Sequence, residues 1–161
     1  MAVDLRFVIV AIKLGPELER VADNAVNIAR YMLDLEDEDW VGPLLDLPRM
    51  LALARAMVSD AIAAYVERDA ERAREVIERD DEVDQYYWKI FRDLVDTMTQ
   101  DPSSVSRSIS LIFVARFAER IADQATNIGE EVVYLVEGEP IRHAGSEGGA
   151  RDSEGGSPHD D

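Results

Sequence analysis

A pair of carboxylates occurs twice in the chain with the same spacing. Residues 19–28 read E-R-V-A-D-N-A-V-N-I and residues 119–128 read E-R-I-A-D-Q-A-T-N-I, so seven of ten positions are identical at an offset of one hundred residues. In each copy a glutamate lies four residues before an aspartate, and on an α-helix this spacing stacks both side chains on one face. Stacked carboxylates repel each other unless a positive charge lies between them. Each copy is therefore a candidate cation site.

The donor atoms indicate the kind of cation. The pairs are Glu19 with Asp23 and Glu119 with Asp123, and an asparagine follows each pair at the same place, which is Asn127 in the second copy. Carboxylate and amide oxygens without thiolates or imidazoles suit hard ions such as Mg, Ca, Mn or iron. An ordinary solvated face is the alternative, because charged helix faces are usually only solvated. The repetition of the whole pattern favours a site.

The second pair lies away from the apolar residues of its own helix. At about 100° per residue, Glu119 and Asp123 share a stripe with Arg116. This stripe is expected to face solvent, a groove or a partner. The opposite stripe is expected to face the core and contains Phe113, Phe117, Ile121, Ala125, Ile128 and Val132.

Two further aspartates interrupt the apolar stripe of another predicted helix. Asp80 and Asp84 lie between Ile77 and Tyr87 in angular position. Half-burying two like charges is costly unless a cation or hydrogen-bond donors compensate them. Two explanations stay open at this stage, namely pairing with an arginine such as Arg116 and ligation of a metal ion.

The composition excludes several other chemistries. The chain has no cysteine, which rules out disulfides, zinc–thiolate sites and thiol catalysis. Its two histidines, His143 and His159, lie in a C-terminal stretch rich in Gly, Ser and acids that is expected to be disordered. Glu-x-x-His di-iron chemistry and histidine-based nucleophilic triads are therefore unsupported. No glycine-rich phosphate loop is present.

Charge and hydropathy limit the partners and the compartment. The net charge of −17 argues against binding of nucleic acid, because no basic patch can form. No signal peptide and no apolar run of about 18 residues is present, so we expect a cytoplasmic protein.

The periodicity predicts an all-α fold, since no segment alternates with period two over a useful length. Helices are expected over about 4–35, from residue 49 onward, over about 69–99 with Asp69 as N-cap, and from Pro102 to about Val136. Gly15-Pro16 is expected to kink or break the first helix near Leu14.

Two stretches resemble one known family. Residues 111–139 read L-I-F-V-A-R-F-A-E-R-I-A-D-Q-A-T-N-I-G-E-E-V-V-Y-L-V-E-G-E, and residues 67–84 read E-R-D-A-E-R-A-R-E-V-I-E-R-D-D-E-V-D. In combination they resemble the second repeat of PhoU-type regulators of phosphate transport. The resemblance extends over roughly Asp4 to His143.

The resemblance implies two three-helix bundles, each with an E/D-x-x-x-D metal motif. Residue by residue, the motif falls on Glu119 and Asp123 and on Glu19 and Asp23, and the neighbouring helix would contribute Asp80 and Asp84, with Asn127 assisting. The implied cofactor is a divalent or ferric ion, namely iron, Mn, Mg or Zn.

The resemblance also implies a role. Such proteins are negative regulators of phosphate uptake and phosphate-starvation signalling, and they are not enzymes. They act in the cytoplasm, commonly as homodimers, by contacting the phosphate ABC transporter and a sensor histidine kinase, and they reach the membrane only through these partners. A metal-dependent hydrolase using the same carboxylates, or an acidic helical bundle without a site, are the alternatives.

The chain departs from the family pattern at its N-terminal end. The expected division is a residual third helix of the first repeat at 1–35, a linker at 36–48, a complete second repeat at 49–138 and a disordered acidic tail at 139–161. Two helices that precede Asp4 in the family pattern are missing. Either Met1 is not the true start, or the first helix packs on the remaining bundle or on another chain. The second site is therefore expected to be complete and the first doubtful.

Overall fold

The computed structural model describes residues 2–35 and 46–138, with side chains from residue 5 onward. It contains α1 (Ala2–Leu33), α2 (Asp46–Glu67), α3 (Ala70–Glu78), α4 (Asp80–Gln100), a short 3₁₀ turn (Pro102–Ser104) and α5 (Val105–Glu137). No strand occurs in these two stretches. The all-α prediction is confirmed.

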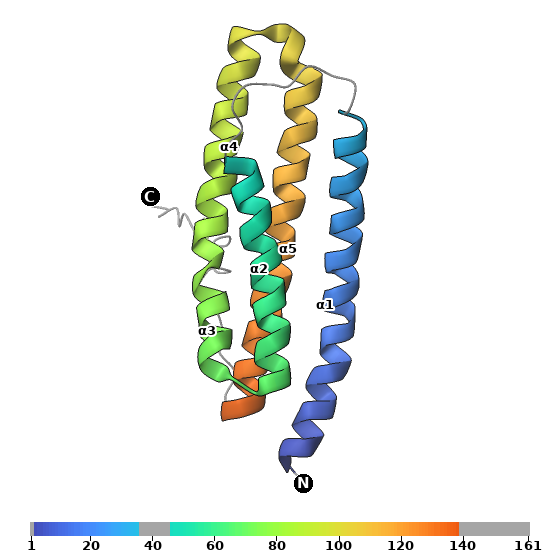
Figure 1. Cartoon of the computed structure of the whole chain (residues 1–161), viewed down its shortest axis with the longest axis vertical. Coiled ribbons are helices and arrows are strands. Elements are labelled where there is room, and N and C mark those ends of the chain that lie inside the picture. Colours follow the sequence, from blue (N-terminus) through green and yellow to red (C-terminus); the bar gives the residue numbers. More distant parts are fainter. Residues whose placement is uncertain (1, 36–45, 139–161) are drawn as a thin grey trace, which may run out of the picture.

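The helices form an antiparallel three-helix bundle with one additional long helix. The first helix of the bundle is α2. Its second helix consists of α3 followed by α4, and its third helix is α5 (Figure 1). The additional helix, α1, packs alongside α5, which contacts every other helix. Residues 36–45 and 139–161, which include most of the predicted linker and the predicted tail with His143 and His159, lie outside the described residues.

The core is built from small and medium apolar side chains on facing stripes. On α2, Met50, Ala54, Met57 and Ala61 are buried. On α5 the predicted core residues Ile121, Ala125, Ile128 and Val132 are buried as well.

Two aromatic residues of that predicted stripe face a different neighbour. Phe113 is exposed over 43% of its surface and Phe117 is half-buried. Both rings contact Tyr31 of α1, with ring centroids 5.2 Å and 5.9 Å away. They belong to the contact between α1 and α5, which the periodicity of α5 alone does not distinguish from the bundle core.

The prediction of one continuous helix over 69–99 is wrong. Asp69 does cap a helix, because its Oδ1 accepts a hydrogen bond from the Arg72 backbone at 3.1 Å. This helix ends at Glu78, however, and α4 begins at Asp80. Asp60 of α2 pairs with Arg72 and Arg79 at 2.9 Å each, so a contact distant in sequence holds the junction.

Two expectations about prolines also need correction. A break near Leu14 does not occur, because α1 is continuous through Pro16 (Figure 1). Proline removes one backbone hydrogen bond from a helix interior, and α1 nevertheless continues on both sides of Pro16 while it packs against α5. Likewise α2 begins at Asp46 rather than after Pro48. Proline is tolerated in a first helical turn, where backbone N–H groups lack helical acceptors.

The contact between α1 and α5 has pseudo-twofold symmetry. Lys13 pairs with Glu131 at 2.7 Å near one end, and Tyr31 stacks on Phe113 near the other. Given the repeat offset of one hundred residues, Lys13 is equivalent to Phe113 and Tyr31 to Glu131. The two equivalent positions of the repeat therefore contact each other twice. In one contact the earlier position lies on α1 and the later one on α5, and in the other contact the arrangement is reversed. The two copies of the repeated decad pack as antiparallel equivalents.

The Asp60 network is expected to stabilise the bundle measurably. Asp60→Ala removes two charge-assisted hydrogen bonds between α2 and the junction, so the free energy of unfolding should fall by about 1–2 kcal/mol in urea denaturation. Glu71→Ala is the control, because the Glu71 side chain is 84% exposed in its pair with Arg74. The control should change stability by less than about 0.5 kcal/mol. Equal effects of the two variants would contradict this role of Asp60.

Candidate metal centre

The second acidic stripe lies in the groove where α5 meets both α4 and α1. On the α4 side, the Arg116 guanidinium lies over the Tyr87 ring, 5.6 Å from its centroid. On the α1 side, Asn127 Nδ2 donates a hydrogen bond to Glu17 Oε2 at 3.4 Å. The stripe is therefore flanked by two neighbouring helices. Of the three surroundings that the sequence left open, namely solvent, a groove or a partner, these contacts favour a groove.

Glu119 is largely enclosed by its neighbours. Its side chain is only 13% exposed, and Oε1 accepts a hydrogen bond from Arg116 Nη1. The other oxygen, Oε2, is buried and has no hydrogen-bond partner in the described part of the chain. A buried carboxylate oxygen without a partner is costly, because nothing replaces its lost hydration.

The burial of Glu119 raises the pKa of its carboxyl group. Desolvation, followed by repulsion from Asp123, raises the pKa of Glu119 to about 7, although Arg116 opposes the shift. The pKa of Asp123 is also raised, first by desolvation and then by Asp84. Three carboxylates from two helices thus hold one another in a state that favours protonation or a bound cation.

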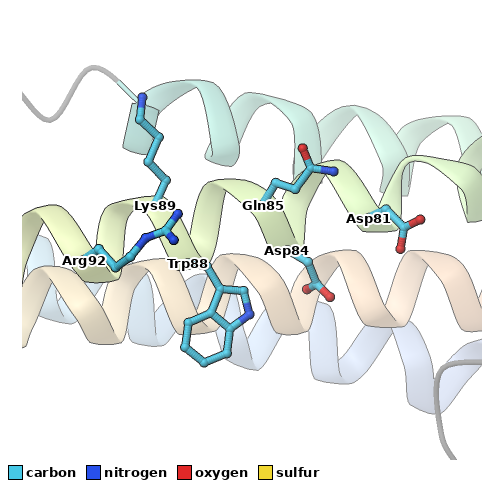
Figure 2. Close-up of a pocket in the computed structure, with 6 residues that line it drawn as sticks. All are labelled: Asp81, Asp84, Gln85, Trp88, Lys89 and Arg92. Atoms are coloured by element: carbon cyan, nitrogen blue, oxygen red, sulfur yellow. The ribbon is translucent and has the colours of Figure 1, made fainter.

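Asp84 supplies the contribution from α4. Its carboxylate projects from α4 towards the side on which α5 lies (Figure 2). Although the residue is largely exposed, partial desolvation and the nearby Asp81 raise its pKa, and Arg116 lowers it. The structure thus brings the predicted residues Glu119, Asp123 and Asp84 into one electrostatic cluster.

The other predicted residues are placed differently. Asp80 is half-buried at the start of α4, and it is not among the charges that shift the pKa values of Glu119 or Asp123. Arg116, one of the explanations left open for the aspartates of α4, is instead hydrogen-bonded to Glu119.

The donor atoms are carboxylate oxygens, which hard cations prefer, but their present positions are too far apart to ligate one ion. Within 2–35 and 46–138, no three acidic or imidazole side chains converge tightly enough to ligate one ion. Glu119 Oε2 nevertheless offers a buried oxygen without a hydrogen-bond partner beside Asp123. Ligation of one ion would therefore require side-chain rotations.

The first copy is not built in the same way. Glu19 and Asp23 are both exposed on α1. Pro16 stands where the second copy has Arg116, so the guanidinium is missing there too. Within residues 2–35 and 46–138, the structure does not bring this pair together with two or more carboxylates that could hold one ion, in agreement with the expectation that the first site is doubtful.

The sequence did not point to Glu17 and Thr126, two residues that lie at or near the acidic stripe of α5. Glu17 lies near the stripe only because α1 packs on α5. Thr126 shares the stripe but is 5% exposed, with its hydroxyl lacking a hydrogen-bond partner among the described residues. No local signal marks either residue, since both depend on the packing of distant helices.

An open hollow of about 710 Å³ lies along α4 next to the cluster (Figure 2). Its lining includes Asp81, Asp84 and the exposed Trp88. Although Asp81 is exposed, its charge contributes to the raised pKa of Asp84.

The metal-free protein should lose stability as the pH rises towards neutrality. Because the pKa of Glu119 is raised in the folded state, the native protein binds more protons than the unfolded chain between the ordinary carboxyl pKa and about 7. In chelator, the free energy of unfolding should fall by up to about 3 kcal/mol between about pH 5 and about pH 8.

Urea denaturation of wild type and of Glu119→Gln tests this expectation. The variant should show a flatter pH profile, whereas Glu19→Gln, which changes an exposed carboxylate, should keep the wild-type profile. The aspartates with lowered pKa values act at more acidic pH, where they stabilise the fold less as they become protonated. Identical profiles for wild type and Glu119→Gln would refute the assignment.

None of the helices in the described residues has an apolar stretch long enough to cross a bilayer.

The PhoU domain family model matches residues 47–132. The chain is 36% identical over 141 residues to the phosphate-specific transport system accessory protein PhoU homolog of Clostridium acetobutylicum. It is 40% identical over 142 residues to the corresponding homolog of Caulobacter vibrioides. These alignments cover 88% of this chain but only 64% and 62% of the two relatives.

Solved structures agree with these similarities. The crystal structure of PhoU from Pseudomonas aeruginosa superposes with a TM-score of 0.82 at 36% identity, covering 86% of this chain and 67% of that one. The phosphate transport system regulatory protein PhoU from Streptococcus pneumoniae gives a TM-score of 0.80 at 29% identity, with 89% and 68% covered. The helical bundle, the repeated decad and these similarities together show that the chain belongs to the PhoU family.

Proposed function

We propose that this chain is a non-enzymatic negative regulator of phosphate uptake and phosphate-starvation signalling. The support is its similarity to relatives named as accessory proteins of the phosphate-specific transport system. The chain spans less than two thirds of the length of these two relatives, so their role is carried over as a proposal. The proposed compartment is the cytoplasm.

The proposed regulator binds a cation in the groove between α4, α5 and α1. Glu119 and Asp123 would be the central ligands, with Asp84 and Asp80 from α4 and with Asn127 assisting. The observation that carries this proposal is the buried Glu119 Oε2, which lacks a hydrogen-bond partner in the described residues. A divalent or ferric ion, namely iron, Mn, Mg or Zn, would supply the positive charge that the cluster lacks.

Cation binding would change the surface that partners meet. The ion would neutralise carboxylates that now repel one another, and it would release the Arg116 guanidinium from Glu119. Arg116 lies over Tyr87, beside the hollow along α4, so its release would alter charge on that face. The proposed partners are the phosphate ABC transporter and a sensor histidine kinase, through which the protein reaches the membrane.

Removal of both central ligands should abolish metal retention. Glu119→Gln with Asp123→Asn keeps side-chain size but removes two negative charges, so the purified variant should retain almost no iron or manganese. Elemental analysis after metal loading and desalting measures this directly. The matched control is Glu19→Gln with Asp23→Asn, which alters the exposed copy.

The control variant should retain the same metal as wild type. A double variant at 119 and 123 that still carries the wild-type metal content would refute the site. The thermal denaturation midpoint offers a second readout, because a ligand that binds only the native state must stabilise it. Metal should raise the midpoint of wild type and of the control, and it should not raise that of the site variant.

Binding to the transporter tests the regulatory role. The purified ATPase subunit of the phosphate ABC transporter should retain the wild-type chain in a pull-down more strongly with metal than with chelator. The variant at 119 and 123 should behave like chelated wild type. Absence of binding under both conditions would argue against this partner, even if metal is retained.

A further inference from the structure

Arg79 is the single residue between α3 and α4, and its backbone sets how one helix follows the other. Its φ is −76° and its ψ is −10°, whereas ψ in an α-helix is about −42°. Its backbone N–H donates to the Val76 carbonyl oxygen at 3.2 Å, three residues back rather than four. A residue bonded in this way rotates the helix that follows it relative to the helix that precedes it.

The Arg79 side chain replaces the helical hydrogen bond that this break removes. In a continuous α-helix the Glu75 carbonyl oxygen would accept a hydrogen bond from the backbone N–H of residue 79. Here it accepts one from Arg79 Nε at 3.1 Å. The same guanidinium pairs through Nη1 with Asp60 Oδ2 of α2 at 2.9 Å. One side chain therefore closes the last turn of α3 and ties this turn to α2.

The helix before the break is fixed by two neighbours. Arg72, near the start of α3, pairs with the other oxygen of Asp60 at 2.9 Å. Towards α5, the two backbones approach so closely that a Cβ atom at Gly129 would lie 3.0 Å from the Ala73 carbonyl oxygen. Because α2 and α5 both hold α3, the orientation of α4 depends on the conformation of Arg79.

The carboxylate that α4 contributes to the candidate metal centre comes soon after the break. Asp84 lies five residues beyond Arg79, and its carboxylate projects towards the side on which α5 lies (Figure 2). Its charge, after desolvation, raises the pKa of Asp123. One residue changed from 3₁₀ to α geometry rotates the following helix by about 20°, which moves a side-chain tip by about 2 Å. Metal ligands must be placed to within about 0.2 Å, so such a movement is large.

We propose that Arg79, held by Asp60, is a positioning residue of the candidate metal centre. The pair fixes the break between α3 and α4 and thereby places Asp84 beside the carboxylates of α5. This inference rests on the proposed cation site and extends it to α2, which supplies none of the proposed ligands. Neither Arg79 nor Asp60 would touch the ion. Replacing residues that orient metal ligands typically weakens metal binding by about 10–100-fold.

Simple electrostatics predicts the opposite effect for Arg79. Its guanidinium is a positive charge close in sequence to Asp80 and Asp84, so its removal would strengthen cation binding if charge alone mattered. If Arg79 holds a ligand in place, its removal weakens cation binding, although the chain becomes more acidic. The sign of the change in affinity therefore distinguishes positioning from charge.

Titration of the full, metal-free chain with Mn²⁺ in a calorimeter measures this sign. Arg79→Gln should raise the Kd for Mn²⁺ by at least about tenfold. The matched control is Arg74→Gln, because Arg74 lies on α3 and also forms a pair between helices, with Glu137 of α5. The control removes the same charge without touching the break, so its Kd should not exceed that of wild type. A Kd of Arg79→Gln at or below the wild-type value would overturn the proposal.

Asp60→Asn tests the other member of the pair. It should also raise the Kd for Mn²⁺ by at least about tenfold. The double variant with Arg79→Gln should bind no more weakly than the weaker single variant, because residues that act as one unit are not additive. The control is Glu67→Gln, which removes an equal charge and the other partner of Arg72 but leaves Arg79 paired. Equal weakening by Asp60→Asn and Glu67→Gln would refute the role of Asp60.

A distance measured without metal tests the placement of α4 directly. The chain has no native cysteine, so spin labels can be attached at Gln85→Cys of α4 and Arg120→Cys of α5, both exposed positions. Pulsed electron paramagnetic resonance should give a label-to-label distance distribution that shifts or broadens when Arg79→Gln is added. Adding Arg74→Gln should leave it unchanged. The same distribution with and without Arg79→Gln would contradict the positioning role.

Failure of this inference and failure of the proposed metal site are distinguishable. If wild type and Arg79→Gln bound Mn²⁺ equally well, the site would stand and the positioning role would fall. If wild type bound no Mn²⁺, the site would fall, and the label distances would decide whether the Arg79 pair orients α4.

A milder variant guards against a folding defect. Arg79→Lys keeps the charge and can pair with Asp60, but it lacks the separate Nε–H donor for the Glu75 carbonyl oxygen. It should raise the Kd for Mn²⁺ by less than Arg79→Gln does, with helical circular dichroism equal to that of wild type. A wild-type Kd for Arg79→Lys would refute the role of the hydrogen bond to Glu75.

Discussion

The close approach of the other helices to α5 is the constraint on which the rest of the structure depends. Small residues make it possible, and Gly129 shows how narrow the space is. A Cβ atom at Gly129 would lie 3.0 Å from the Ala73 carbonyl oxygen and 3.1 Å from Ile77 Cγ1. The fully buried Ala118, Ala122 and Ala125 lie on the same helix. Because neighbours reach α5 so closely, side chains at the edges of the contact lose water even when they are charged.

The candidate metal centre follows from this packing. Glu119 and Asp123 are on the edge of the α5 contact, where α4 and α1 remove part of their hydration. Arg116 compensates one oxygen of Glu119 and leaves the other without a partner in the described residues. One guanidinium thus leaves part of the negative charge of the carboxylate cluster unneutralised. A cation that neutralised this charge would gain its binding free energy from doing so. The same stripe on an isolated helix would be an ordinary solvated face.

The two copies of the decad differ because their surroundings differ. They pack on each other as antiparallel equivalents, as the exchanged pairs Lys13–Glu131 and Tyr31–Phe113 show. Beyond that contact, α5 has three helices against its other sides, whereas the outward face of α1 is exposed. Glu19 therefore lies on an exposed helix face, while the Glu119 side chain is only 13% exposed. The same carboxylate pair therefore has different surroundings in the two copies, because its burial differs and because Pro16 stands in place of Arg116.

The sequence predicted the helical class, the helix periodicity, the cap at Asp69 and the stacked carboxylates, because all of these depend on residues close along the chain. It also directed attention to Asp84, since a charge within an apolar stripe is visible in the periodicity. The break at Arg79, the continuity of α1 through Pro16 and the hydrogen bond from Arg116 to Glu119 were decided differently. The break and the continuity depend on contacts between segments distant in sequence. The hydrogen bond joins residues three apart in the chain, but the desolvation of Glu119 that makes it significant depends on helices distant in sequence. Which of the two identical carboxylate pairs is desolvated becomes visible only once the helices are packed, because desolvation depends on which helices come close.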